Sequence, residues 1–224
     1  AAQEKVEQMV ASAGSELMKV IGRLESDWKA SYSEECNLGQ FEADAFRMKA
    51  GSDIAFINGG GLRKNLLKGD ITVGDIWEIN PFGNTIVTFS VKGKTLLEMI
   101  KNRIMIKAKK KCKGESSEML NVSGLSYSYN SALISCSDTV RIPENLIISS
   151  NIGRTTLDPQ RTYTIATNNY ITAQFKKFFG DISKKIKFTD TQMIDRVVII
   201  EAVENLGVIN SVLEKRVVDV SGKK

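Results

Sequence analysis

The sequence of 224 residues contains no histidine. This absence excludes Ser-His-Asp and Cys-His catalytic sites, and zinc sites that use histidine ligands. It also excludes the histidine-and-carboxylate metal sites that phosphoesterases commonly use. Any chemistry in this chain would therefore have to use carboxylates, lysines or groups that another domain supplies.

Cysteine is scarce as well, since the chain has only Cys36, Cys112 and Cys136. These three are too few and too far apart for a zinc finger or a disulfide framework. At most one disulfide can form, which leaves one thiol over and the redox compartment undecided.

Long apolar runs are also missing, because no stretch approaches the roughly 18 uninterrupted apolar residues of a membrane span. The first residues, Ala1–Glu4, show no apolar segment of a signal peptide. A chain whose leader was removed, or one cut from a longer protein, would look the same.

The remaining composition is that of an ordinary globular protein, with 42% hydrophobic and 25% charged residues. The length allows one large domain or two small ones. The net charge of +5 is concentrated at Lys107–Lys113 and in a second group, Lys176, Lys177, Lys184, Lys185 and Lys187. A basic run without aromatic residues is typical of a solvated loop, so nucleic-acid binding is the least favoured interpretation.

The spacing of apolar residues predicts helices over residues 4–19, 41–49, 94–108 and 195–206, the last ending at Gly207. Thr72 followed by Asp75 resembles a capping box and predicts a further helix over 72–80. The alternating pattern at 85–91, rich in β-branched residues, predicts a strand. Further strands are predicted at 20–24, 54–57, 125–129, 133–136, 145–150, 163–168 and 217–220. We expect 125–129 and 133–136 to pair through a turn at Asn130-Ser131, and residues 174–179 are ambiguous. This order predicts one α/β domain with α+β-like mixed sheets and flanking helices.

Three consecutive glycines, Gly59–Gly61, follow the buried strand predicted at 54–57. Asn58 precedes them and Arg63 follows two residues later. Consecutive glycines leave backbone N–H groups uncovered, where a ligand can approach closely. The run therefore predicts a loop that contacts a ligand or an anion; the alternative is a tight turn with a solvent-facing Arg63.

Several short motifs surround this loop in a definite order. They are Glu35–Gln40, Ala43–Ala45, Asn58–Arg63, Gly69–Thr72, Pro81–Thr85, Val91–Gly93, Leu120–Leu125, Tyr163–Tyr170 and Asp195-Arg196. In this order and spacing they resemble the C-terminal domain of the 5′-nucleotidase family, from about residue 20 to the end of the chain.

The resemblance implies a division of labour between two domains. In the family, an N-terminal metallophosphoesterase domain holds two metal ions and a catalytic His–Asp pair. A hinge helix joins it to the C-terminal domain, which binds the nucleoside and rotates to present the phosphate. Residues 1–19 would then be similar to the hinge helix and residues 20–224 to the nucleoside-binding domain, with the catalytic domain absent.

Several expectations about partners and location follow from this resemblance. The chain alone would have no catalytic residue, metal site or cofactor, because divalent metal ions belong to the absent domain. That domain would act as a partner in cis or in trans on nucleoside 5′-phosphates, and the chain by itself would bind weakly and hydrolyse nothing. Family members are mostly periplasmic, secreted or surface-anchored, which implies an extracytoplasmic location.

The resemblance also implies polar contacts to the nucleotide from Asn58 and Arg63, with Gly60 between them in the loop. Asn offers a donor and an acceptor to a base or ribose edge, and Arg suits a phosphate or ribose oxygen. Asn84 belongs to the next motif and is a further candidate contact. The alternative for Asn84 is that it holds the turn through its side chain. Asp44 is better explained as a structural residue than as a catalytic one.

Two aromatic side chains are expected to enclose the base. The resemblance assigns one face to Phe82 and the other to Tyr170, and each stacked face contributes on the order of 1–3 kcal/mol. The alternatives are that Phe82 is a core residue beneath a turn and that Tyr170 is an ordinary aromatic at a strand end.

The sequence departs from the family pattern at two places. The Gly-Gly-Asp-Gly loop expected after Tyr170 is missing, and Asp181 lies too far along to replace its Asp. Tyr32 stands where many members have an Arg. Gln174 or Lys176 are possible substitutes for the lost contacts. These departures favour, as the alternative function, a non-catalytic ligand-binding or structural module with a degenerate nucleoside pocket.

Overall fold

The computed structural model describes residues 14–136, 142–182 and 186–222. Its central element is a five-stranded mixed sheet with the strand order β10-β4-β9-β2-β5. These strands are β10 (Thr189–Ile194), β4 (Thr85–Lys92), β9 (Thr162–Asn168), β2 (Ile54–Asn58) and β5 (Leu120–Ser123). The two strands β2 and β9 are parallel, and the other neighbours are antiparallel.

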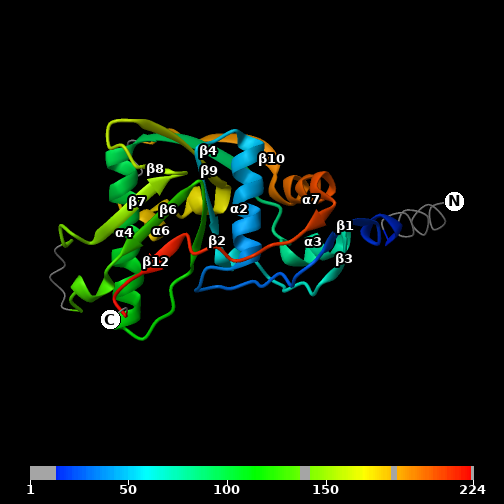
Figure 1. The fold of residues 1–224 in the computed structure, drawn as a ribbon. Coiled ribbons are helices and arrows are strands. Elements are labelled where there is room, and N and C mark those ends of the chain that lie inside the picture. Colours follow the sequence, from blue (N-terminus) through cyan, green and yellow to red (C-terminus); the bar gives the residue numbers. More distant parts are fainter. Residues whose placement is uncertain (1–13, 137–141, 183–185, 223–224) are drawn as a thin grey trace.

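Two smaller sheets complete the fold (Figure 1). One has the order β11-β1-β3, with β11 (Val208–Ile209), β1 (Val20–Leu24) and β3 (Gly69–Thr72). The other has the order β12-β6-β7-β8, with β12 (Val217–Asp219), β6 (Leu125–Tyr129), β7 (Ile147–Ile152) and β8 (Thr155–Thr156). Mixed sheets with flanking helices confirm the predicted fold class.

The helices are α2 (Asn37–Ala50), α3 (Val73–Ile79), α4 (Gly93–Cys112), α5 (Asn169–Ala173), α6 (Phe175–Phe179) and α7 (Asp195–Leu206). Short 3₁₀ turns form at Gly59–Gly61 and Ser131–Leu133. The capping box that begins α3 is present, because Thr72 Oγ1 accepts a hydrogen bond from Asp75 N at 3.1 Å, and Asp75 Oδ2 accepts one from Thr72 N at 3.0 Å. The four helices predicted at 41–49, 72–80, 94–108 and 195–206 are therefore confirmed, with α2 and α4 longer than expected.

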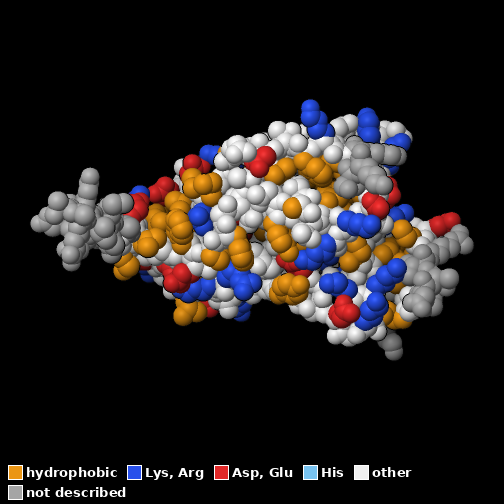
Figure 2. Space-filling view, turned by 180° about the vertical axis from the view of Figure 1, so that it is seen from behind, with side chains coloured by type: hydrophobic (Ala, Val, Ile, Leu, Met, Phe, Trp, Pro, Cys, Tyr) orange, Lys and Arg blue, Asp and Glu red, His pale blue; other side chains and the backbone are white. Residues whose placement is uncertain are grey.

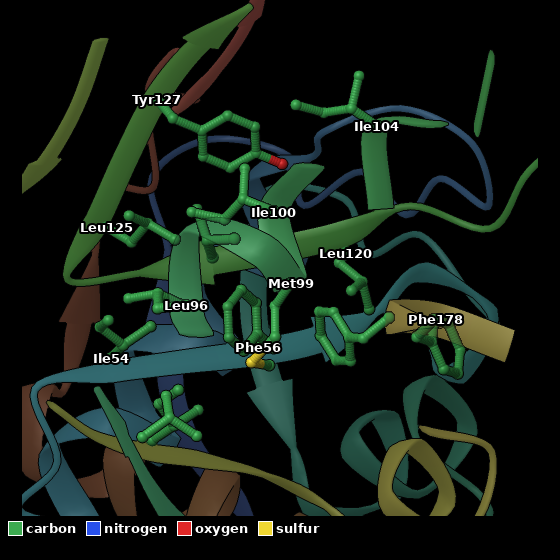
Figure 3. Close-up of a cluster of buried hydrophobic side chains, with 14 of the residues drawn as sticks. Ile54, Phe56, Leu96, Met99, Ile100, Ile104, Leu120, Leu125, Tyr127 and Phe178 are labelled. Atoms are coloured by element: carbon green, nitrogen blue, oxygen red, sulfur yellow. The ribbon is translucent and has the colours of Figure 1, made fainter. Parts of the chain in front are cut away.

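Strand β2 separates the two halves of the hydrophobic core, because successive side chains of a strand point to opposite faces. Ile54 and Phe56 lie in a cluster with Leu96, Met99 and Ile100 of α4, which Figure 3 shows gathered around them. Ala55 and Ile57 belong to the second cluster, which includes buried residues of α2, α3 and α7. Because buried side chains cover both faces of this sheet, functional groups that reach solvent have to lie at the ends of its strands.

The lysine-rich segment at 107–113 is helical through Cys112, so its prediction as a loop was wrong. Lys109–Lys111 occupy the last turn of α4, where cations interact favourably with the helix dipole. Figure 2 shows, on the face that it draws, separate groups of Lys and Arg side chains with Asp and Glu between them. That face is not one continuous basic surface.

The predicted hairpin between 125–129 and 133–136 was also wrong. Residues Ser131–Leu133 form a 3₁₀ turn, because the Asn130 side-chain oxygen accepts a hydrogen bond from Ala132 N at 3.0 Å. Strand β6 pairs with β7 and β12 instead. The strand predicted at 145–150 begins two residues later, and the ambiguous segment 174–179 contains the helix α6.

The disulfide that the sequence allowed joins Cys112 to Cys136, with Cα atoms 5.6 Å apart, and Cys36 is a buried free thiol.

Of the helix predicted at 4–19, residues 4–13 lie outside the described residues, while 14–17 are helical. Within the described ranges, no helix is long and apolar enough to cross a membrane.

Candidate functional site

One edge of the five-stranded sheet gathers the residues that the sequence singled out. The parallel strands β2 and β9 both end there, followed by Gly59–Gly61 and by Tyr170 respectively. The antiparallel strand β4 begins there, since Ile86 pairs with Asn168, so Phe82 precedes it at the same edge. Sheet pairing alone therefore brings three segments together that are far apart in the sequence.

The buried carboxylate of Glu118 lies at the centre of this edge. It accepts hydrogen bonds from Asn58 Nδ2 at 2.7 Å, Gly60 N at 3.0 Å and Lys177 Nζ at 2.8 Å. The residue is only 4% exposed. A buried carboxylate needs such donors, because burying a charge without partners is very unfavourable. The Glu118 carboxylate therefore already accepts the hydrogen bond of Gly60 N, one of the N–H groups that the glycine run was expected to present to an anion.

Asn58 lies beneath the loop and has partners on both ends of its amide. Its oxygen accepts a hydrogen bond from Asn168 Nδ2 at 2.9 Å, and Asn168 Oδ1 in turn accepts one from Ile171 N at 2.9 Å. This chain of bonds ties the end of β2 to the start of α5. Asn58 thus supports the loop from within, and its contact with a ligand remains a prediction.

Lys177 links the Glu118 carboxylate to Tyr170. Its Nζ donates to the Tyr170 hydroxyl at 2.9 Å and lies 5.3 Å from the centroid of the Tyr170 ring. Burial by itself lowers the pKa of Lys177, but the hydrogen bonds to Glu118 and Tyr170 outweigh it and raise the pKa. The ammonium group is therefore charged, and it fixes the Tyr170 ring, which is 38% exposed.

Phe82 and Arg63 form the outer part of the site. The Phe82 side chain is 57% exposed, so its alternative interpretation as a core residue was wrong. The Arg63 guanidinium carbon lies 5.9 Å from the centroid of the Phe82 ring, and Arg63 Nη1 donates to Gly60 O at 3.4 Å. Gly59–Gly61 form a turn with an exposed Arg63, as the simpler interpretation of the run predicted.

Asn84 and Asp44 have structural partners. The Asn84 carbonyl accepts a hydrogen bond from Asp195 N at 2.8 Å, and its side chain bonds the Asp195 carboxylate. This supports the alternative in which Asn84 holds its turn, and its contact with a ligand stays a prediction.

Asp44 receives two bonds from Arg216, both at 2.8 Å. That pair ties α2 to the segment before β12, as expected of a structural residue.

The two departures from the family pattern both lie at this edge. Tyr32 packs beside the glycine loop, where its Cε2 atom is 3.4 Å from the position that a Cβ of Gly60 would take. The missing Gly-Gly-Asp-Gly loop is replaced by α5 and α6, and Lys177 reaches the site from α6. The predicted substitute Lys176 bonds Asp181 instead, at 3.4 Å.

Sequence reasoning missed Glu118 and Lys177. No strand was predicted at 120–123, and the antiparallel register of β5 against β2 is what places Leu120 opposite Asn58 and Glu118 beyond it, next to Gly60. Nothing in the sequence distinguished Lys177 from its neighbour Lys176. The described ranges contain no group of three or more Cys, Asp or Glu side chains that could hold a metal ion.

The chain is similar to known proteins both in sequence and in fold. The family model of the 5′-nucleotidase C-terminal domain matches residues 18–181. Protein UshA of Yersinia enterocolitica is 32% identical over 189 residues, which are 83% of this chain and 30% of that protein. The 5′-nucleotidase precursor of Thermus thermophilus has a TM-score of 0.76 and 27% identity, covering 97% of this chain and 43% of that one.

A third relative shares the fold at lower identity. The NAD nucleotidase of Haemophilus influenzae has a TM-score of 0.73 and 18% identity, over 96% of this chain and 41% of that one. The chain thus spans less than half the length of these relatives. By the family model and by the fold, it belongs to the 5′-nucleotidase family and corresponds to the C-terminal domain of its members.

Proposed function

We propose that this chain binds the nucleoside part of a nucleoside 5′-phosphate at the glycine-loop edge, with the base between Phe82 and Tyr170. The observation that carries the proposal is the Glu118 network. It joins the glycine loop through Gly60 N to Lys177, and through Lys177 to the Tyr170 hydroxyl. A half-exposed aromatic ring fixed in this way is preorganised for stacking, because it loses little freedom on binding.

The polar groups around the two rings suit the rest of such a ligand. Arg63 is exposed beside Phe82, and a guanidinium binds phosphate or ribose oxygens well. Lys177 uses two of its three N–H donors on Glu118 and Tyr170, which leaves one for a ligand oxygen. Both cations would favour a ligand that carries negative charge.

Hydrolysis of the phosphate ester belongs, in this proposal, to a metal-binding domain outside these residues. The chain corresponds to only 43% of the Thermus thermophilus protein and 30% of the Yersinia enterocolitica protein. Residues 1–19 would be the hinge-like helix and 20–224 the nucleoside-binding domain. The partner domain acts in cis or in trans and supplies the metal ions, and without it the chain binds substrate but does not cleave it.

An extracytoplasmic location is part of the same proposal. The disulfide between Cys112 and Cys136 supports it, because structural disulfides form and persist mainly in oxidising compartments. The periplasm or the cell exterior would provide that environment.

Calorimetric titration of the 224-residue chain with adenosine tests the proposal. We expect saturable binding that weakens about 5- to 150-fold in Phe82→Ala, as the loss of one stacked face predicts. Met48→Ala is the control, because Met48 is 71% exposed on α2, away from the glycine-loop edge. It should bind like the unmodified chain.

A second candidate is a non-catalytic module with a different ligand or a structural role. Occupation of the Gly60 N–H by Glu118, and the position of Tyr32 beside the loop, favour it. It predicts no response to adenosine, or a response that Phe82→Ala leaves unchanged.

A further inference from the structure

The loop that carries Phe82, residues 80–84, is attached at both ends to the first residue of α7. Near its start, Asn80 Nδ2 donates to Asp195 Oδ2 at 3.1 Å. At its end, Asp195 N donates to the carbonyl of Asn84 at 2.8 Å. One residue of a helix thus binds the loop before and after the exposed Phe82.

Arg196 contacts the middle of the same loop. Its Nη1 donates to the carbonyl of Pro81 at 3.2 Å, and its guanidinium carbon lies 3.7 Å from the centroid of the Trp77 ring. A Cβ on Gly83 would lie 2.8 Å from Arg196 Nη2, and Gly83 has a φ of +63°. Arg196 is therefore held between an aromatic ring of α3 and the loop backbone, and the helices α3 and α7 lie side by side (Figure 1).

The loop is attached to α7 through a cluster of buried polar side chains. Burying polar and charged groups costs free energy that apolar packing would not cost. Asp195 is 0% exposed, Asn80 4% and Glu42 of α2 1%. Within the described residues, Asn80 Oδ1 and Glu42 Oε1 have no hydrogen-bond partner. The attachment of the loop to α7 is therefore buried, whereas Phe82 itself is 57% exposed.

We infer that Asp195 and Arg196 are positioning residues, which hold the Phe82 loop in the conformation that stacks on a base. Neither residue needs to touch the ligand, because Arg196 bonds the Pro81 carbonyl while Asp195 bonds the Asn80 side chain and the Asn84 carbonyl. This inference rests on the proposed function, since it assigns Phe82 to the ligand.

A double-mutant cycle with Arg196→Gln and Phe82→Ala tests it, together with hydrogen exchange of the Asp195 amide that holds the end of the loop. Arg196 is partly exposed, so Arg196→Gln should fold. We expect its adenosine affinity to fall about 3- to 10-fold, and the Asp195 amide, which donates to the Asn84 carbonyl, to exchange at least 5-fold faster. In the Phe82→Ala background, Arg196→Gln should cause no further loss, because its effect passes through the absent ring.

Arg23→Gln is the matched control, because it also removes an exposed arginine, one that pairs with Asp70 at 2.6 Å on β3. It should change neither the adenosine affinity nor the exchange rate of the Asp195 amide. The inference would be overturned if the losses of adenosine affinity in the cycle were additive. It would also be overturned if the Asp195 amide exchanged as slowly in Arg196→Gln as in the control. If the unmodified chain binds no adenosine, the proposed function fails, whereas the exchange rates still decide whether Arg196 restrains the loop.

Discussion

The carboxylate of Glu118 lies 3.0 Å from the backbone nitrogen of Gly60, so the glycine loop already binds an anion that belongs to the protein. Three donors converge on this carboxylate, and one of them, Lys177, also bonds the Tyr170 hydroxyl. The loop therefore contributes to the site by fixing Glu118 and, through Lys177, one aromatic wall.

Replacing Gly60 by alanine should disturb this arrangement, whereas the same change at Gly61 should not. A Cβ on Gly60 would lie 2.3 Å from Glu118 Oε1, while the nearest atom to a Cβ on Gly61 is 3.6 Å away. Overpacking against a fixed, buried group costs about 1–3 kcal/mol. In urea unfolding, Gly60→Ala should lose stability by that amount and Gly61→Ala by less than about 0.5 kcal/mol. Equal losses in the two variants would show that Glu118 is free to move.

Glu118→Gln should destabilise the chain without altering its shape. The amide cannot be ionised, and its NH₂ group would face one of the three donors that now converge on the carboxylate. Hydrogen bonds to a charged group are worth about 1.5–3 kcal/mol each, so we expect a loss of roughly 2–4 kcal/mol in chemical denaturation. A loss below about 0.5 kcal/mol would contradict a central role for this carboxylate.

The disulfide between Cys112 and Cys136 should stabilise the domain by constraining its unfolded state. The cysteines are 24 residues apart, and a loop of that length corresponds to about 3 kcal/mol. Replacing both cysteines by serine should therefore lower the free energy of unfolding by roughly 2–4 kcal/mol. A reducing agent should weaken the unmodified chain by a similar amount and leave the double variant unchanged. If reduction affects both equally, the disulfide is not the source of the loss.

Glu42 should make stability depend on pH. Burial, and secondarily the negative charge of Asp195, raise its pKa from 4.5 to about 8. Because the folded protein holds this proton more tightly than the unfolded chain, the stability that Glu42 contributes is complete below pH 4.5 and is lost as pH rises through about 8.

Glu42→Gln replaces the ionisable carboxyl by an amide that does not titrate, and is therefore the informative variant. Between pH 5 and pH 8.5, the unmodified chain should lose on the order of 2–4 kcal/mol relative to Glu42→Gln. Thermal or urea unfolding of both proteins across this range measures the difference. A constant difference between the two proteins would mean that Glu42 titrates alike in the folded and unfolded states.

Local sequence patterns predicted most of the elements of the fold. The apolar run at 54–57, the β-branched run at 85–91 and the Thr72 capping box each formed the expected element, because local propensity and burial agree there. The prediction at 133–136 failed because a local cap and a distant covalent bond together decide the conformation there. Asn130 caps a 3₁₀ turn, and Cys136 is tied to Cys112 of α4.

The site was predictable only in part, for a similar reason. Phe82 and Tyr170 were predicted from their motifs, and both side chains are exposed, while their contact with a base stays a prediction. Glu118 and Lys177 reach that edge through the register of β5 against β2 and through the position of α6, which no local pattern encodes. The contacts that fix the Tyr170 ring were therefore the part that the sequence could not show.

The most direct test of nucleoside recognition is a crystal structure of the 224-residue chain with saturating adenosine. We expect the base to lie against the Phe82 ring, with Tyr170 on its other face and the Glu118 network unchanged. Adenosine bound elsewhere, or an empty glycine-loop edge at saturation, would contradict the proposed function.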